Sequence, residues 1–102
     1  MSVRAVYNDF NVVKVIYTRH VEDKFIQEKY VFQLGITKHH IKQTLLNPVK
    51  QDNTRGEKIT AIGHIDEDHE LVVIYRKEKP DKRIIITFFP AKKDRYAAKL
   101  LP

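Results

Sequence analysis

The sequence contains no cysteine, and no apolar run in it approaches the roughly 20 residues of a membrane-spanning helix. Without cysteine the chain has no disulfides, no thiolate nucleophile, no Cys-containing zinc site and no iron–sulfur cluster. Small secreted domains often depend on disulfides, so their absence favours the reducing cytoplasm. The first ten residues lack the apolar segment of a signal peptide. We therefore expect a cytoplasmic protein with no membrane partner.

The chain also lacks the motifs of several common enzyme classes. G-x-S-x-G, Walker A, H-E-x-x-H and G-x-G-x-x-G are all missing. The five histidines do not show metal-ligand spacing, and His39 and His40, adjacent on a predicted helix, should point in different directions. We expect no metal and no cofactor.

Positive charge, by contrast, is plentiful. The 102 residues include 19 Lys and Arg against 13 Asp and Glu, for a net charge of +6, and 42% of residues are apolar. This length and composition predict one soluble domain, residues 1–102, with a single core. A basic surface favours polyanions such as nucleic acid. An anionic membrane surface, an acidic protein or no such partner at all also fits the charge.

Most of the predicted sheet lies in one stretch, Glu57 to Pro90. Three runs rich in Ile, Val, Tyr, Phe and Thr are joined there by two polar connections, 66–69 and 77–82. Their length and composition predict a three-stranded antiparallel meander. A further strand is expected over Val12–Tyr17, and residues 1–10 form a loose tail or an edge strand.

Local end signals delimit the helices. Thr18 is placed to cap a helix that Gly35 ends, and Thr37 begins a second helix that stops before Pro48. Residues 49–56 read as a long polar loop. Residues 91–101 read as a short C-terminal helix.

The predicted order is β-α-α-β-β-β-α. This is an α+β fold in which two helices pack on one face of an antiparallel sheet of three to four strands, followed by a short C-terminal helix.

A four-residue loop at 79–82 would place Arg76 opposite Ile85 and Ile74 opposite Thr87. One sheet face is then plainly core, whereas Arg76 and Thr87 interrupt the second apolar face. A charged residue on such a face needs solvent, a partner or a ligand. Three interpretations fit: Arg76 reaches water at a strand end, the face binds or reacts with a ligand, or it is covered by a second copy or by the N-terminal segment.

His20 is the candidate proton-transfer residue, in the first turn of the first helix. Arg19 precedes it, and Lys24 follows one turn later on the same helix face. A helix N-terminus attracts phosphate, so Arg19 and Lys24 could hold phosphates beside a His that acts as base or acid. An ordinary surface His fits equally well.

The segment Lys92, Lys93, Arg95 and Tyr96 could contact a phosphate backbone. A solvated helix face explains it equally well.

The motifs Thr18-Arg19-His20, Gly35-Ile36-Thr37 and Leu45-Leu46-Asn47-Pro48, with the strands 71–76 and 84–87, resemble a group of small bacterial and archaeal proteins. That group is similar to the RelE/ParE-like toxin superfamily, including BrnT-type toxins. The resemblance spans about residues 12–90. It implies a RelE-like fold and metal-independent ribonuclease chemistry.

By the same resemblance, His20, Lys24, Arg76 and Thr87 occupy site positions, with His20, Arg76 and Thr87 catalytic. Arg95 and Tyr96 would stand near the C-terminus as in RelE-like enzymes. The chain departs from the group at 30–32, where Tyr-Val-Phe replaces a short basic approach to the glycine.

Three functions remain open. The leading hypothesis is a toxin of a toxin–antitoxin system that cleaves RNA or binds the ribosome and pairs with an antitoxin protein. In it, His20 or Tyr96 transfers the proton, and Arg76, Lys24 and Arg19 stabilise the phosphorane charge. The second hypothesis is a non-enzymatic module that binds nucleic acid or protein. The third is a homodimeric accessory protein joined through its second sheet face.

Overall fold

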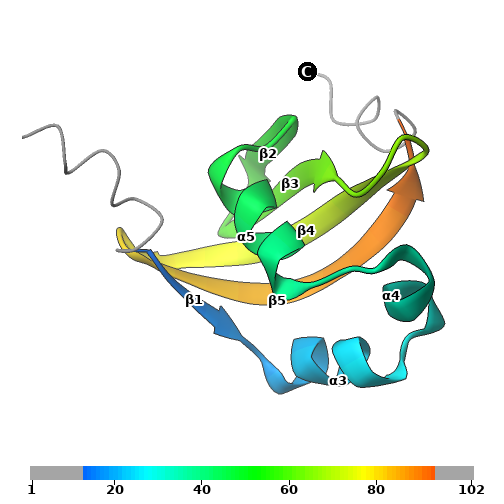
Figure 1. Ribbon diagram of the computed structural model, residues 1–102. Helices are drawn as coiled ribbons and strands as arrows, with labels where there is room; N and C mark the ends of the chain where they lie inside the picture. Colours follow the sequence, from blue (N-terminus) through cyan, green and yellow to red (C-terminus); the bar gives the residue numbers. More distant parts are fainter. Residues whose placement is uncertain (1–12, 94–102) are drawn as a thin grey trace, which may run out of the picture.

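The computed structural model describes residues 13–93, in which a five-stranded sheet carries three short helices (Figure 1). The strands lie in the order β1-β5-β4-β3-β2. Their bounds are β1 Lys14–Tyr17, β2 Lys50–Arg55, β3 Lys58–His64, β4 His69–Lys79 and β5 Lys82–Lys92. The helices are α3 Arg19–Gln27, α4 Lys29–Leu34 and α5 Lys38–Leu46. No helix within residues 13–93 is long and apolar enough to cross a membrane.

The sheet is mixed, and the prediction of an antiparallel sheet of three to four strands is wrong. Strands β3, β4 and β5 do form the expected antiparallel meander. Strand β2 extends it on one side, and β1 pairs with β5 in parallel on the other. The predicted loop at 49–56 is largely β2, whose polar sequence gives no alternating apolar signal because an edge strand can face solvent.

The helical layer has three helices rather than the two that were predicted. Glu28 is extended (φ −83°, ψ 126°) and separates α3 from α4. On one continuous helix, Val21 and Val31 would point about 80° apart at 100° per residue. The break lets both side chains be buried in the same core. The predicted C-terminal helix is contradicted at Ala91 and Lys92, which lie in β5. Lys93 forms a turn, and residues 94–101 and 1–10 lie outside the described residues.

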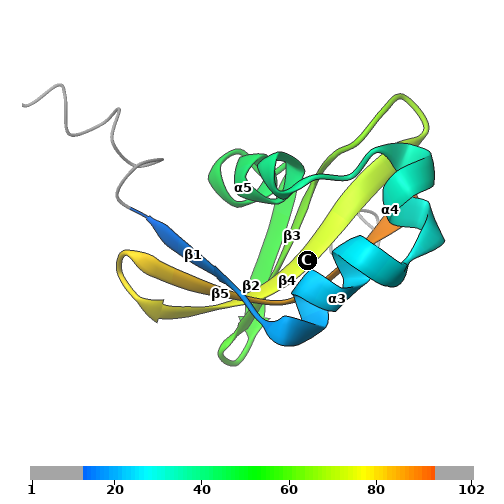
Figure 2. The same cartoon turned by 60° about the horizontal axis from the view of Figure 1, so that its bottom comes forward.

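The core fills the space between the helices and one face of the sheet (Figure 2). Its buried members include Val21 and Ile41 from the helices, and Leu71, Val73 and Phe88 from β4 and β5. Gly63 on β3 lets α5 approach, since a Cβ there would lie 2.1 Å from Thr44 Oγ1. This close packing is what fixes α5 over the sheet.

The predicted strand register is right at one pair and wrong at the next. Ile74 faces Thr87 as expected, but Arg76 faces Ile84 rather than Ile85. The register shifts between Ile74 and Tyr75, so Ile86 is an extra residue on β5, which is a β-bulge. The bulge turns Ile85 into the core, where it is fully buried.

We call the opposite side of the sheet the second face. Cross-strand partners share a face, and alternation along each strand assigns the rest. Its members include Lys14, Lys58, Ile62, Val72, Ile74, Arg76, Lys82, Ile84, Thr87 and Phe89. Ile62 and Val72 form a small buried cluster there, with Phe89 and Ala91 packed against it.

Candidate functional site

The start of α3 is fastened to β5. Thr18 caps α3, since its Oγ1 accepts from the backbone N–H of Val21 at 3.4 Å. The same hydroxyl donates to the carbonyl oxygen of Ile85 at 3.1 Å. His20 follows in the first turn, and its Nε2 lies 3.3 Å from Thr87 Oγ1. The structure therefore joins two of the three predicted catalytic residues.

The position of Thr87 places this contact at an edge. Strand β1 pairs with β5 only as far as Ile85, and α3 packs beside β5 beyond that point (Figure 2). Thr87 follows the bulge and pairs with Ile74, so it belongs to the second face. His20 is exposed and contacts the sheet where its edge meets that face.

Arg76, the third predicted catalytic residue, shares the second face with Thr87. It lies two residues beyond Ile74 on β4, which is about 6.6 Å along the strand. Its Nη2 is 3.8 Å from Glu78 Oε2. On β3 its cross-strand partner is Lys58, another cation.

Lysines extend this charge toward the end of the β4–β5 hairpin. Lys82 faces Lys14 on one side and Lys79 on the other. Lys82 Nζ donates to Glu78 Oε1 at 3.0 Å, and this bond is the main cause that lowers the pKa of Glu78. One carboxylate thus lies between two cations. We define the basic strip as Lys14, Lys58, Arg76 and Lys82.

The basic strip is accessible to a ligand. The side chains of Arg76 and Lys82 are 43% and 31% exposed, and Lys14 and Lys58 are also exposed. Cations directly opposite one another on neighbouring strands repel each other and destabilise the folded sheet. The strip therefore concentrates positive charge beside the half-buried apolar side chains of Ile74 and Ile84.

The predicted phosphate ligands on α3 are placed differently from one another. Arg19 is exposed at the first helical position. The Lys24 ammonium lies 5.4 Å from the ring centre of Phe88 and 5.5 Å from that of Tyr30. It makes cation–π contacts with both rings, and Phe88 belongs to the core. Lys24 thus stabilises the packing of α3.

Lys92 and Lys93 lie at the other end of the sheet. Lys92 faces His69, seven residues before Arg76 on β4, so the two sites are roughly 23 Å apart. Both lysines line a groove with Glu67 and Asp68, whose carboxylates offset their charge. Arg95 and Tyr96 lie outside the described residues. Those predicted nucleic-acid contacts that fall within residues 13–93 therefore do not form one patch.

Sequence reasoning missed a groove lined by histidines. His39, His40 and His64 line it between α5 and β3. Burial, and then the neighbouring His39, lower the pKa of His40. In the part of the chain described, no group of three His, Asp or Glu side chains could hold a metal ion.

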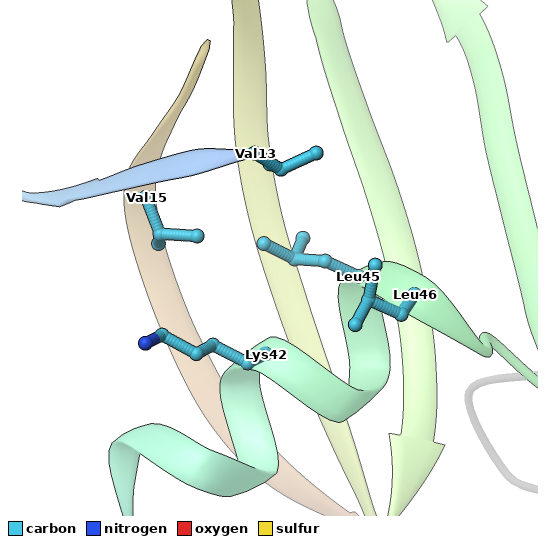
Figure 3. A pocket seen from close by; sticks show the side chains of 5 residues that line it. All are labelled: Val13, Val15, Lys42, Leu45 and Leu46. Atoms are coloured by element: carbon cyan, nitrogen blue, oxygen red, sulfur yellow. The ribbon is translucent and has the colours of Figure 1, made fainter. Parts of the chain in front are cut away.

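A small apolar gap lies between β1 and α5. Val13, Val15, Lys42, Leu45 and Leu46 surround it (Figure 3). Its volume is about 10 Å³, room for one water-sized group at most. It is a packing defect and not a ligand site.

Comparison with family models, characterised proteins and solved structures gave no match.

Proposed function

We propose that the protein binds single-stranded RNA on its second face. The observation that carries the proposal is the pairing of like charges, with Arg76 opposite Lys58 and Lys14 opposite Lys82. Cations paired across neighbouring strands destabilise a sheet that has no ligand bound. Proteins keep such unfavourable pairs mainly at functional sites. A polyanion removes the repulsion by placing phosphates between the cations.

The shape and chemistry of the face favour a single strand. A sheet face is a broad surface, and it cannot enter the groove of a nucleic-acid duplex as a single helix can. Half-buried Ile74 and Ile84 offer apolar contacts beside the basic strip. Single-strand binders combine a positive track with apolar or aromatic platforms for the bases.

Binding of a fluorescent single-stranded RNA, followed by anisotropy at several salt concentrations, tests this proposal. Four phosphate contacts predict a slope of log K against log salt near −3, from about −0.7 per contact. Arg76→Gln should weaken binding and reduce the slope by about 0.7. Lys29→Gln, at an exposed position of α4, is the matched control and should change neither. Equal effects of the two variants would contradict the proposal.

A second candidate function is metal-independent RNA cleavage, and the contact between His20 and Thr87 favours it. The neutral imidazole of His20 would take the proton of a ribose 2′-OH as that oxygen attacks the adjacent phosphorus. The phosphorus–5′-oxygen bond breaks, a 2′,3′-cyclic phosphate forms, and the leaving oxygen takes a proton from water. The resulting hydroxide removes the proton from the His20 imidazolium, which restores the neutral base. Arg76, on the same face as Thr87, would stabilise the charge of the phosphorane.

Incubation of labelled RNA with the protein in EDTA tests this chemistry. Cleavage that disappears in His20→Ala, with RNA binding retained, supports the assignment. Cleavage that survives in both His20→Ala and Arg76→Ala would remove the site from consideration. Binding without cleavage would leave a non-enzymatic module.

A toxin role, with an antitoxin or the ribosome as partner, rests on the resemblance to RelE/ParE-like toxins. The cytoplasmic location belongs to the same proposal. Growth arrest on induced expression, absent with Arg76→Gln, would support it, and normal growth would speak against it. A homodimer through the second face is a competing use of the same surface. It predicts that Arg76→Gln changes the sedimentation coefficient.

A further inference from the structure

We infer that the end of the β4–β5 hairpin holds a phosphate monoester, which would be the terminal phosphate of the bound RNA strand. The inference deepens the proposed function and rests on it. Lys14, Lys79 and Lys82 line a pocket of about 220 Å³ there, together with Asp81. The three lysines come from three strands that are neighbours in the sheet, in the order β1, β5 and β4 (Figure 1).

Backbone and side-chain hydrogen bonds hold the pocket in place. The N–H of Lys14 donates to the carbonyl oxygen of Asp81 at 2.6 Å, which fixes β1 against the hairpin turn. Arg83 Nη1 donates to the carbonyl oxygens of Lys79 and Pro80 at 3.1 Å and 3.0 Å. The Arg83 guanidinium thus stabilises the turn. The side chains of the three lysines line the pocket.

The charges of the pocket suit a dianion. Lys82 shares Glu78 with Arg76, whereas Lys14 and Lys79 form no ion pair within residues 13–93. Asp81 is the only acid among the lining residues that the structure describes. With Glu78 included, the four cations Lys14, Arg76, Lys79 and Lys82 face two carboxylates, which leaves a net charge of +2. A phosphate monoester carries about −1.5 to −2 charge at neutral pH and offers three acceptor oxygens.

The location favours a terminal phosphate over an internal one. The pocket lies at the end of the basic strip, which shares Lys14 and Lys82 with it. An RNA strand that follows the strip from Lys58 and Arg76 reaches the hairpin tip, where the sheet ends. An internal phosphodiester carries one negative charge only, and it would match three ammonium groups less well.

Anisotropy with three RNAs of one sequence tests the inference: one with a 5′-phosphate, one with a 3′-phosphate and one with hydroxyls at both ends. One of the phosphorylated strands should bind about five- to tenfold more tightly than the hydroxyl strand, as a few charge-assisted hydrogen bonds at an exposed site allow. Lys79→Gln should abolish this ratio and leave the affinity for the hydroxyl strand unchanged. Lys77→Gln, on the same strand but outside the pocket, is the matched control.

The outcomes separate the two proposals. Equal affinity for all three strands overturns the terminal-phosphate site and leaves RNA binding intact. If no RNA binds, the proposed function fails, and titration with inorganic phosphate followed by amide NMR then decides the site. Shifts confined to Lys14, Lys79, Asp81 and Lys82, and lost in Lys79→Gln, would support it. Shifts spread over the surface, or none, would overturn it.

Discussion

His20 Nε2 lies 3.3 Å from Thr87 Oγ1, although 67 residues separate the two in the chain. The contact depends on the Thr18 cap, which fastens α3 to β5, and on the bulge at Ile86, which sets the face that Thr87 occupies. An imidazole and a hydroxyl thus meet beside the basic strip. Local helix capping and one irregularity of a strand together build the candidate site.

Thr87→Val tests the role of this contact. The hydrogen bond is exposed and long, so its loss should change the free energy of unfolding by less than about 0.5 kcal/mol. The imidazole signals of His20 should nevertheless shift, and any EDTA-resistant cleavage should fall. Thr60→Val, elsewhere on the second face, is the control. Unchanged His20 signals in Thr87→Val would show that the two side chains do not interact.

Tyr17→Phe should stabilise the protein. The Tyr17 hydroxyl is buried without a hydrogen-bond partner in the described structure, and burial, with a smaller effect of Glu22, raises its pKa. Removing an unsatisfied hydroxyl should add about 1 kcal/mol to the free energy of unfolding in urea. Tyr75→Phe is the contrasting variant, because burial raises the pKa of the Tyr75 hydroxyl while the positive charge of Arg83 lowers it. A loss of stability in Tyr17→Phe would mean that the hydroxyl has a partner.

Gly63→Ala should destabilise the protein. The new Cβ would lie 2.1 Å from Thr44 Oγ1 and 2.9 Å from Thr44 Cβ, so α5 must move away from β3. Overpacking of this kind costs about 1–3 kcal/mol, measurable by thermal or urea unfolding. Adding Thr44→Ala removes the nearest atom and should restore part of the loss. No recovery in the double variant would place the cause elsewhere.

The turn between β3 and β4 should weaken in acid. Asp66 Oδ1 accepts from the N–H of Asp68 at 2.8 Å and lies 3.0 Å from His69 Nδ1. The hydrogen bond from the Asp68 N–H is the main cause that holds the pKa of Asp66 below its ordinary value of 3.8, and the hydrogen bond from His69 is the second cause. A lowered pKa in the folded state means that the stabilisation is present above 3.8 and is lost as the pH falls through the lowered value.

Unfolding of the wild type and of Asp66→Asn across this acid range measures the effect. The difference in free energy of unfolding should shrink as the pH falls. Asp68→Asn is a control that retains the Asp66 carboxylate. A difference that stays constant with pH would show that the Asp66 charge does not matter.

Local features of the fold were predictable from sequence, and non-local ones were not. Thr18, Gly35 and Thr37 delimit helices as expected, because caps act within one turn. The parallel pairing of β1 with β5 joins residues about 68 positions apart, and no local pattern specifies it. The bulge at Ile86 leaves no signal in the sequence, because Ile84, Ile85 and Ile86 form a continuous apolar run in which one extra residue does not stand out.

The candidate site shows the same division. His20 and Thr87 were proposed from their types and positions, and the structure brings them together. Lys24 was proposed on helical spacing, and the structure adds contacts of its ammonium with the rings of Tyr30 and Phe88 that the sequence did not indicate. The like-charge pairs of the basic strip could not be predicted from the sequence. Lys14 lies far from Lys82, and Lys58 far from Arg76, so only the strand register brings each pair together.

The salt dependence of RNA binding by Arg76→Gln tests the central claim most directly. Arg76 lies in the middle of the basic strip, opposite Lys58 and beside Glu78. The wild type should bind single-stranded RNA with a log–log salt slope near −3, and Arg76→Gln should bind more weakly with a slope smaller by about 0.7. Lys29→Gln should match the wild type. RNA binding unaffected by Arg76→Gln, or affected equally by Lys29→Gln, would contradict the assignment of RNA binding to the second face.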